Sequence, residues 1–106
     1  MFQKKADGKE RLLVDGVYLK VRAHGEKTLM GEFRLEKGAV VPAHDHPHEQ
    51  VGVLLSGRLR FTVDGEPVDA EPGDAWCIPG GVPHSAEALE DSVAVEVFSP
   101  VREDYL

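Results

Sequence analysis

The sequence lacks several features that define large classes of protein. Cys77 is the only cysteine in 106 residues, so no internal disulfide can form. No apolar run approaches the roughly 20 residues that cross a bilayer. The first residues, MFQKKADGKE, also lack the apolar core of a signal peptide. We therefore expect a cytoplasmic protein that does not enter a membrane, with Cys77 as a small core residue.

Positive charge is also scarce. The chain has 12 basic against 19 acidic residues, a formal net charge of −7. Binding to a nucleic acid backbone or an anionic membrane surface requires a basic surface, so neither partner is expected. A small molecule remains the expected partner, because a few arginines in a cleft can bind an acidic substrate whatever the net charge.

Glycine (11) and proline (7), in contrast, recur along the whole chain. The stretches between them are short and either alternate or are rich in β-branched residues, which is typical of an all-β barrel or sandwich. Only the C-terminal VREDYL and a turn near 86–91 are candidates for a helix. The chain reads as one domain, 1–106, with predicted strands at 11–14, 17–23, 28–35, 40–43, 50–55, 58–63, 66–70, 74–78, 84–88 and 93–98.

The clearest local signal is the hairpin RLRFTVDGEPVDA. Leu59, Phe61 and Val63 alternate with polar residues, which places one face of the strand in a core and the other in water. The pair Asp64-Gly65 is a strong signal for a two-residue turn.

Three of the five histidines lie in the segment PAHDHPHEQ. His44 and His46 are two residues apart, so on an extended strand both rings project to one face and can converge on a metal ion. Gln50 begins the next predicted strand, and His84 opens another. Taken alone, the segment fits a polar loop of solvated histidines better than a metal site.

The wider spacing resembles the cupin superfamily. The first cupin motif matches at Gly38, His44, His46, Gln50 and Gly57, and the second at Gly73, Pro79, Gly81 and His84. Two positions depart from the pattern: Gln50 replaces the usual Glu of the first motif, and Ala88 replaces the usual Asn of the second.

This resemblance implies a jelly-roll barrel, the double-stranded β-helix, with a metal-site core at about 38–98. It also implies one divalent transition-metal ion (Zn, Ni, Mn, Fe or Cu) bound by His44, His46, Gln50 and His84. Glu49 is the rival to Gln50, because a carboxylate is the better ligand. Strand parity favours Gln50: if it points inward, Glu49 points outward. His48 is left outside the site.

The tail resembles that of the pectin-degradation cupins, which convert 4,5-unsaturated uronates to their ketonised form. Its run of acid, one residue, Phe, Ser, Pro, one residue, Arg ends in two acids and contains Glu96, Phe98 and Arg102. The resemblance implies a metal-dependent isomerase or lyase. Glu96 would be the acid–base group, although the family usually has Asp there. Arg102 would bind the uronate carboxylate. Phe98 would form an apolar wall, and Trp76 would either join that wall or lie in the core.

Two other functions stay open from the sequence. One is an iron-dependent cupin dioxygenase, which oxygen consumption with Fe(II) would reveal. The other is a non-catalytic sugar- or effector-binding cupin. Whether the protein is an enzyme at all is left open. We also expect a homodimer, since the segment 11–20 can pair with the sheet edge of a neighbouring chain.

Overall fold

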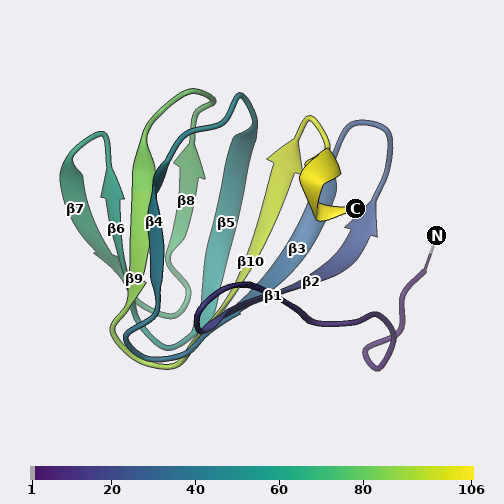
Figure 1. Ribbon diagram of the computed structural model, residues 1–106, viewed down its shortest axis with the longest axis horizontal. Coiled ribbons are helices and arrows are strands. Elements are labelled where there is room, and N and C mark those ends of the chain that lie inside the picture. The colour runs from purple at the N-terminus through teal and green to yellow at the C-terminus, as the bar shows by residue number, and fades with distance from the viewer. Residues whose placement is uncertain (1) are drawn as a thin grey trace.

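The computed structural model describes residues 2–106, and its regular secondary structure is almost all β-strand (Figure 1). Every predicted strand is present, with bounds within one residue of those expected. The one helix is the 3-10 turn η1 (Glu103–Tyr105), within the expected VREDYL. The strands are β1 (Arg11–Val14), β2 (Val17–His24), β3 (Leu29–Leu35), β4 (Val40–His44), β5 (Glu49–Ser56), β6 (Leu59–Val63), β7 (Glu66–Ala70), β8 (Ala75–Ile78), β9 (His84–Ala88) and β10 (Ser92–Ser99).

The strands form two antiparallel sheets, which confirms the all-β prediction. The larger sheet has the order β1-β2-β3-β10-β5-β8, and the smaller has β4-β9-β6-β7. In Figure 1 the smaller sheet lies at the left and the larger sheet runs from β8 to β2. The turn near 86–91 is not helical, because β9 extends to Ala88 and bends follow it. Residues 2–106 contain no helix with the length and hydropathy of a membrane span.

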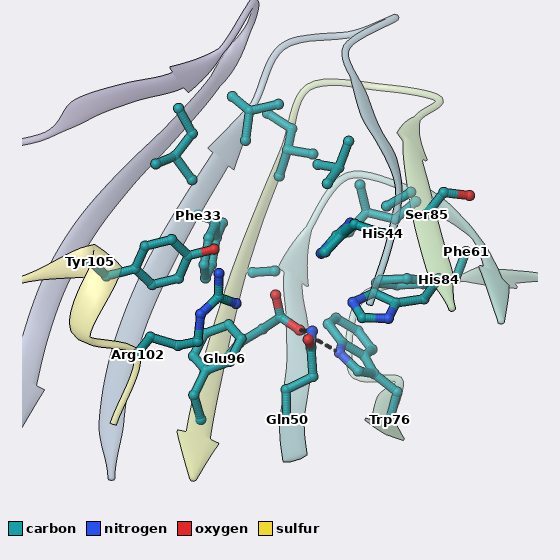
Figure 2. A pocket seen from close by; sticks show the side chains of 18 residues that line it. Phe33, His44, Gln50, Phe61, Trp76, His84, Ser85, Glu96, Arg102 and Tyr105 are labelled. Atoms are coloured by element: carbon teal, nitrogen blue, oxygen red, sulfur yellow. Dashed lines mark hydrogen bonds between the residues drawn. The ribbon is translucent and has the colours of Figure 1, made fainter. Parts of the chain in front are cut away.

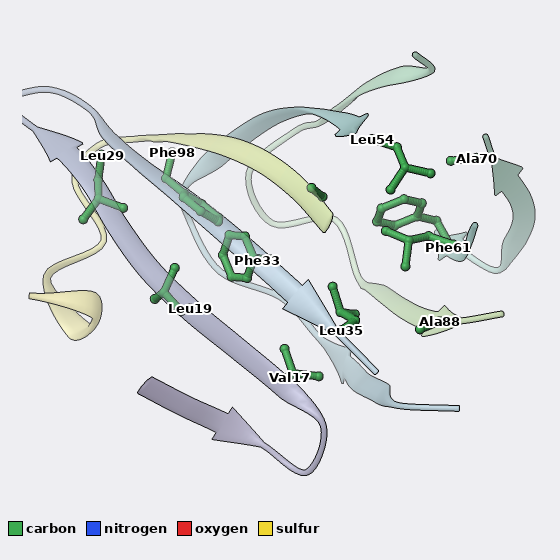
Figure 3. Packing of buried hydrophobic residues seen from close by; sticks show 12 residues of the cluster. Val17, Leu19, Leu29, Phe33, Leu35, Leu54, Phe61, Ala70, Ala88 and Phe98 are labelled. Atoms are coloured by element: carbon green, nitrogen blue, oxygen red, sulfur yellow. The ribbon is translucent and has the colours of Figure 1, made fainter. Parts of the chain in front are cut away.

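The core lies between the two sheets and follows strand alternation. On β3, Leu29, Phe33 and Leu35 are buried while Met30 and Arg34 are exposed. Figure 3 shows two parts of this core, one around Leu19, Leu29, Phe33 and Phe98 and one around Phe61, Leu54 and Ala88. Burial of these apolar side chains is the main force that holds the sheets together.

The β6–β7 hairpin confirms its sequence pattern. Leu59 and Phe61 are buried. Asp64 and Gly65 adopt φ angles of 50° and 84°, the left-handed values that a two-residue turn of this type requires. The hairpin brings Phe61 against Trp76 of β8, with the two ring centroids 4.6 Å apart.

Two expectations about single residues are wrong. Cys77 is exposed on β8, and its neighbour Trp76 takes the inward position instead. The strand expected to carry both His44 and His46 ends at His44, so His46 lies in the connection to β5.

The closest packing around a glycine with positive φ is at Gly57, between β5 and β6. Gly57 has φ +87°, and a Cβ there would collide with the carbonyl oxygen of Asp91 and the hydroxyl of Ser92. Gly38 has the same φ, but nothing lies within 4 Å of its Cβ position.

We expect Gly38→Ala to destabilise the fold by about 1–2 kcal/mol, the usual cost of a left-handed conformation. Gly57→Ala should cost roughly a further 1–3 kcal/mol, because backbone atoms must move to admit the methyl group. Urea unfolding of both variants measures the difference. An equal loss of unfolding free energy in the two variants would show that the structure relieves the collision at Gly57 at no cost.

Candidate metal centre and cavity

A cavity between the two sheets collects most of the residues singled out from the sequence. His44, Gln50, His84, Glu96, Phe98 and Arg102 all line it. His46 is buried directly beside it, with its ring centroid 4.9 Å from that of His84. Figure 2 shows His44 and His84 on one side of the cavity and Arg102 with Tyr105 on the other, with Glu96 between them. Residues about 50 positions apart in the sequence therefore line the same cavity.

The three histidines have the geometry of a metal centre. One ring nitrogen from each of His44, His46 and His84 lies within 4.8 Å of the other two, so the three could hold a metal ion. His44 ends β4, His84 opens β9, and these two residues are paired in the ladder between the strands. Sheet register therefore brings together two of the three rings, and the turn after β4 delivers the third.

Each imidazole is held by a backbone carbonyl. Nδ1 of His44, His46 and His84 lies 2.8, 2.9 and 2.8 Å from the carbonyl oxygens of Pro42, His48 and Val82 respectively. A carbonyl oxygen can only accept, so Nδ1 carries the proton in all three rings. The unprotonated Nε2 atoms then face the cavity, as metal ligation requires.

The donor set fits a cation. Nε2 of His84 is buried and has no hydrogen-bond partner among residues 2–106. Nε2 of His46 lies 2.9 Å from Oε1 of Gln50, and with the proton on Nδ1 both of these atoms are acceptors. A shared cation satisfies such a pair. Burial lowers the pKa of His46 and of His84, which keeps both rings neutral and able to ligate.

Strand parity correctly separates Gln50 from its rival. Gln50 is 5% exposed and lines the cavity, whereas Glu49 is exposed and accepts a hydrogen bond from the thiol of Cys77 on the outer face. The Gln50 amide is fixed at both ends, since Oε1 faces His46 and Nε2 donates to Oε2 of Glu96. His48 does not line the cavity.

Glu96 lies on β10 beside Gly52 of β5, which in turn pairs with Trp76 of β8. A Cβ on Gly52 would lie 2.7 Å from the indole and 2.8 Å from the Glu96 side chain. The glycine therefore lets the two side chains meet, and Trp76 Nε1 donates to Glu96 Oε2 over 2.9 Å.

The environment of Glu96 favours its neutral form. Burial raises the pKa of the Glu96 carboxyl, although the hydrogen bonds from Trp76 and Gln50 act in the opposite direction. Both bonds use Oε2, so Oε1 is the oxygen left for a ligand in the cavity.

Arg102 is fixed at the other side of the cavity. Its Nε and Nη2 donate to the two carboxylate oxygens of Asp104, over 3.0 and 2.8 Å. The guanidinium also stacks 4.2 Å from the ring centroid of Tyr105 and 5.1 Å from that of Phe98. The hydroxyl of Tyr105 is a further hydrogen-bonding neighbour of the guanidinium, which faces the cavity beside it (Figure 2).

Two residues at this site were missed from the sequence and one was only half recognised. Asp104 and Tyr105 were missed, although Asp104 stands only two residues after Arg102. Trp76 was considered as an apolar wall or a core residue, and it also donates a hydrogen bond to Glu96. Gly52 of β5 could have predicted the contact between Trp76 and Glu96, because a glycine within a strand often marks a place where neighbouring groups approach closely.

Comparison with known proteins agrees with this architecture. Residues 31–100 match the family described as Cupin domain. The chain is 30% identical over 96 residues to pectin degradation protein KdgF of Dickeya dadantii, covering 89% of this chain and 87% of that protein. It superimposes on the structure of KdgF from a Halomonas species with TM-score 0.94 and 31% identity, covering 100% of this chain and 98% of that one.

A more distant match bears on the metal. Bacillus subtilis oxalate decarboxylase, a protein with Mn(II) centres, superimposes with TM-score 0.78 and 27% identity, covering 90% of this chain but 28% of that one. The fold, the three histidines and the family match lead to the same conclusion. This chain belongs to the cupin family and resembles its pectin-degradation members.

Proposed function

We propose that the cavity holds one divalent transition-metal ion on Nε2 of His44, His46 and His84 and on Oε1 of Gln50. The support is the fixed tautomer of all three rings together with the facing acceptors of His46 and Gln50. All four groups are neutral, so a bound ion would keep its full charge and supply Lewis-acid polarisation of a substrate oxygen.

We further propose that the protein opens and ketonises 4,5-unsaturated uronates. The observation that carries this proposal is the placement of Glu96 between two of the histidines, His44 and His84, and the guanidinium of Arg102 in one cavity. A uronate needs these three things together: a polarising centre, a proton-transfer group and a cationic anchor for its carboxylate. Similarity to KdgF supports the same assignment.

The reaction is an isomerisation and needs no co-reactant. The C1 hydroxyl loses its proton, the bond from C1 to the ring oxygen breaks, and the ring oxygen becomes the hydroxyl of an enol at C5. That hydroxyl then loses a proton while C4 gains one, which gives the ketone. In our proposal, Glu96 moves these protons through Oε1, while Oε2 stays bonded to Trp76 and Gln50. A carboxyl with a raised pKa suits this role near neutral pH.

Arg102 would bind the substrate carboxylate through the Nη1 end of its guanidinium. Asp104 already occupies the Nε side, which prevents rotation of the fork. Phe98 and Trp76 would form apolar walls beside the sugar ring, and the aromatic stack of Arg102 on Tyr105 adds to the rigidity of the anchor. The cytoplasmic location expected from the sequence stays a prediction.

Metal binding is tested by calorimetric titration of metal-free protein with Zn²⁺, Ni²⁺ and Mn²⁺. We expect one equivalent to bind. His84→Ala should weaken binding by more than about 100-fold, because loss of groups that merely hydrogen-bond to ligands already costs about 10–100-fold. His24→Ala is the matched control, since His24 is exposed at the end of β2. Equal affinity in the two variants would contradict the proposed ligands.

Glu96→Gln tests proton transfer. The amide oxygen of Gln can still accept from Trp76 and Gln50, so the cavity should keep its shape while the titrating group is lost. We expect kcat, followed as loss of the enol-ether absorbance, to fall about 10²–10⁴-fold. Metal affinity should hardly change. Glu49→Gln, which alters the exposed neighbour of Gln50, should retain full activity. An unchanged rate in Glu96→Gln would remove the assigned role.

Asp104→Asn tests the positioning of Arg102. Asn offers one acceptor in place of two, so the guanidinium is less well held and substrate binding suffers. We expect KM to rise about tenfold with kcat nearly constant. Glu103→Gln is the control, because Glu103 is exposed and adjacent. A fall in kcat at constant KM would instead mean that Asp104 takes part in the chemistry.

A further inference from the structure

Tyr105 of η1 lies in the wall of the cavity, and the proposed reaction leaves its hydroxyl without a role. Its ring packs edge-on against Phe33 and Phe98, with ring centroids 6.1 and 5.6 Å away. From β1, the guanidinium of Arg11 lies 5.8 Å from the centroid of the same ring, and its Nη2 donates to the backbone carbonyl oxygen of Asp104 over 2.9 Å. These contacts hold the ring against the barrel and so fix the direction of the hydroxyl.

The hydroxyl points into the cavity beside the guanidinium of Arg102 (Figure 2). The two groups are hydrogen-bonding neighbours. A guanidinium has N–H donors and no acceptor, so the hydroxyl oxygen accepts in this bond. The hydrogen of the hydroxyl is therefore left to donate to another group, and a ligand in the cavity is within its reach.

Asp104 limits what Arg102 can offer to such a ligand. Its carboxylate accepts from Nε and from Nη2, over 3.0 and 2.8 Å. Because Tyr105 accepts a further N–H and has an O–H of its own, it returns one donor to the cavity for the one that it uses. A carboxylate in the cavity can then have one oxygen at the guanidinium and the other at the hydroxyl.

The chain contains the same three kinds of side chain a second time, on its outer surface. Arg34 donates to both carboxylate oxygens of Glu10 and lies 4.1 Å from the ring centroid of Tyr18, its register partner on β2. Glu10 and Arg34 are exposed, so water can satisfy their remaining hydrogen-bonding groups. Arg102 is 9% exposed, and in the cavity a bound acceptor takes the place of that water.

The Tyr105 hydroxyl also stays protonated over a wide range of pH. Burial raises the pKa of this hydroxyl above its ordinary value. The positive charge of Arg102 acts in the opposite direction, and the acids Asp104 and Glu96 act in the same direction as burial. The hydroxyl is therefore a hydrogen-bond donor throughout the neutral range.

We propose that Tyr105 is a second contact for the substrate carboxylate: its hydroxyl donates to one carboxylate oxygen while the guanidinium of Arg102 binds the other. The inference rests on the proposed function, because it takes a uronate as the ligand. Two donors on two oxygens fix the orientation of the carboxylate as well as its position. The other side of the sugar ring then faces His44 and His84, across the cavity from Tyr105.

The first experiment measures calorimetric binding of galacturonate, a saturated uronate that cannot undergo the reaction. Tyr105→Phe removes only the hydroxyl, and the ring keeps its packing and its stack on Arg102. We expect the Kd of galacturonate to rise about tenfold, as for loss of one hydrogen bond to a charged group. Tyr18→Phe is the matched control, because it removes a hydroxyl from the arginine-stacked tyrosine outside the cavity. Its Kd should equal that of the wild-type protein.

The second experiment measures the rate with a 4,5-unsaturated uronate. In Tyr105→Phe we expect KM to rise about tenfold and kcat to stay within about twofold of the wild-type value, because the hydroxyl holds the carboxylate equally in the ground state and the transition state. Metal affinity should not change. Since Phe retains the packing of the ring, a purely structural role of Tyr105 predicts no change in either constant.

An unchanged galacturonate affinity in Tyr105→Phe would overturn the inference. So would an equal loss in Tyr18→Phe, a wild-type protein that does not bind galacturonate, or a Tyr105→Phe variant whose kcat falls while KM stays constant. Failure of the proposed function gives a different result. The wild-type protein would then bind galacturonate, and would lose affinity with Tyr105→Phe, but it would not accelerate the reaction of the unsaturated uronate.

Discussion

The site depends on three hydrogen bonds between imidazole rings and backbone carbonyls. Each carbonyl holds one ring nitrogen, and each therefore leaves the other nitrogen unprotonated and aimed into the barrel. Pro42 lies within β4 at the ladder irregularity between Val41 and His44, His48 immediately precedes β5, and Val82 stands two residues before β9. The backbone therefore positions the rings of His44, His46 and His84, and it also leaves Nε2 as the nitrogen that can bind a metal ion.

The register of the larger sheet positions Glu96, the proposed proton-transfer group, in the same way. Gly52 has Glu96 as its partner on one side and Trp76 on the other, and it has no side chain of its own. Any larger residue at that position would separate the indole from the carboxyl. This contact joins β5, β8 and β10, which are far apart in sequence, so it exists only once the whole sheet has formed. The cost of local flexibility at a strand glycine is offset by the hydrogen bond that Glu96 accepts from Trp76.

Strand positions and inward-facing residues were largely predictable from the sequence, because alternation fixes parity and glycine and proline mark the turns. Parity alone separated Gln50 from Glu49. It failed at Cys77, because the run Ala75–Ile78 is apolar on both faces and shows no alternation. β5 and β10 also carry apolar residues on both faces, and their Val51, Val53 and Val95 point away from the core. Alternation cannot tell which face of such a strand is buried, because strands that are apolar on both faces are usually covered on both sides. Asp104 and Trp76 were missed as polar partners, because a hydrogen bond between side chains leaves no periodic trace in a sequence.

The first cupin motif usually has Glu at the position of Gln50. The amide removes a negative charge from the proposed ligand set, and it also changes the hydrogen bonding with Glu96. A carboxylate at this position would have only acceptors, and it would face the carboxylate of Glu96 at hydrogen-bonding distance. Two such groups cannot both be ionised without strong repulsion. An amide has an acceptor at one end and a donor at the other, so Gln50 presents Oε1 to His46 while Nε2 donates to Glu96. The same side chain therefore links the histidine cluster to the carboxyl. In the proposed mechanism, protonation of Glu96 would change the strength of that bond but not the charge of Gln50, so the charge of the proposed ligand set would stay the same.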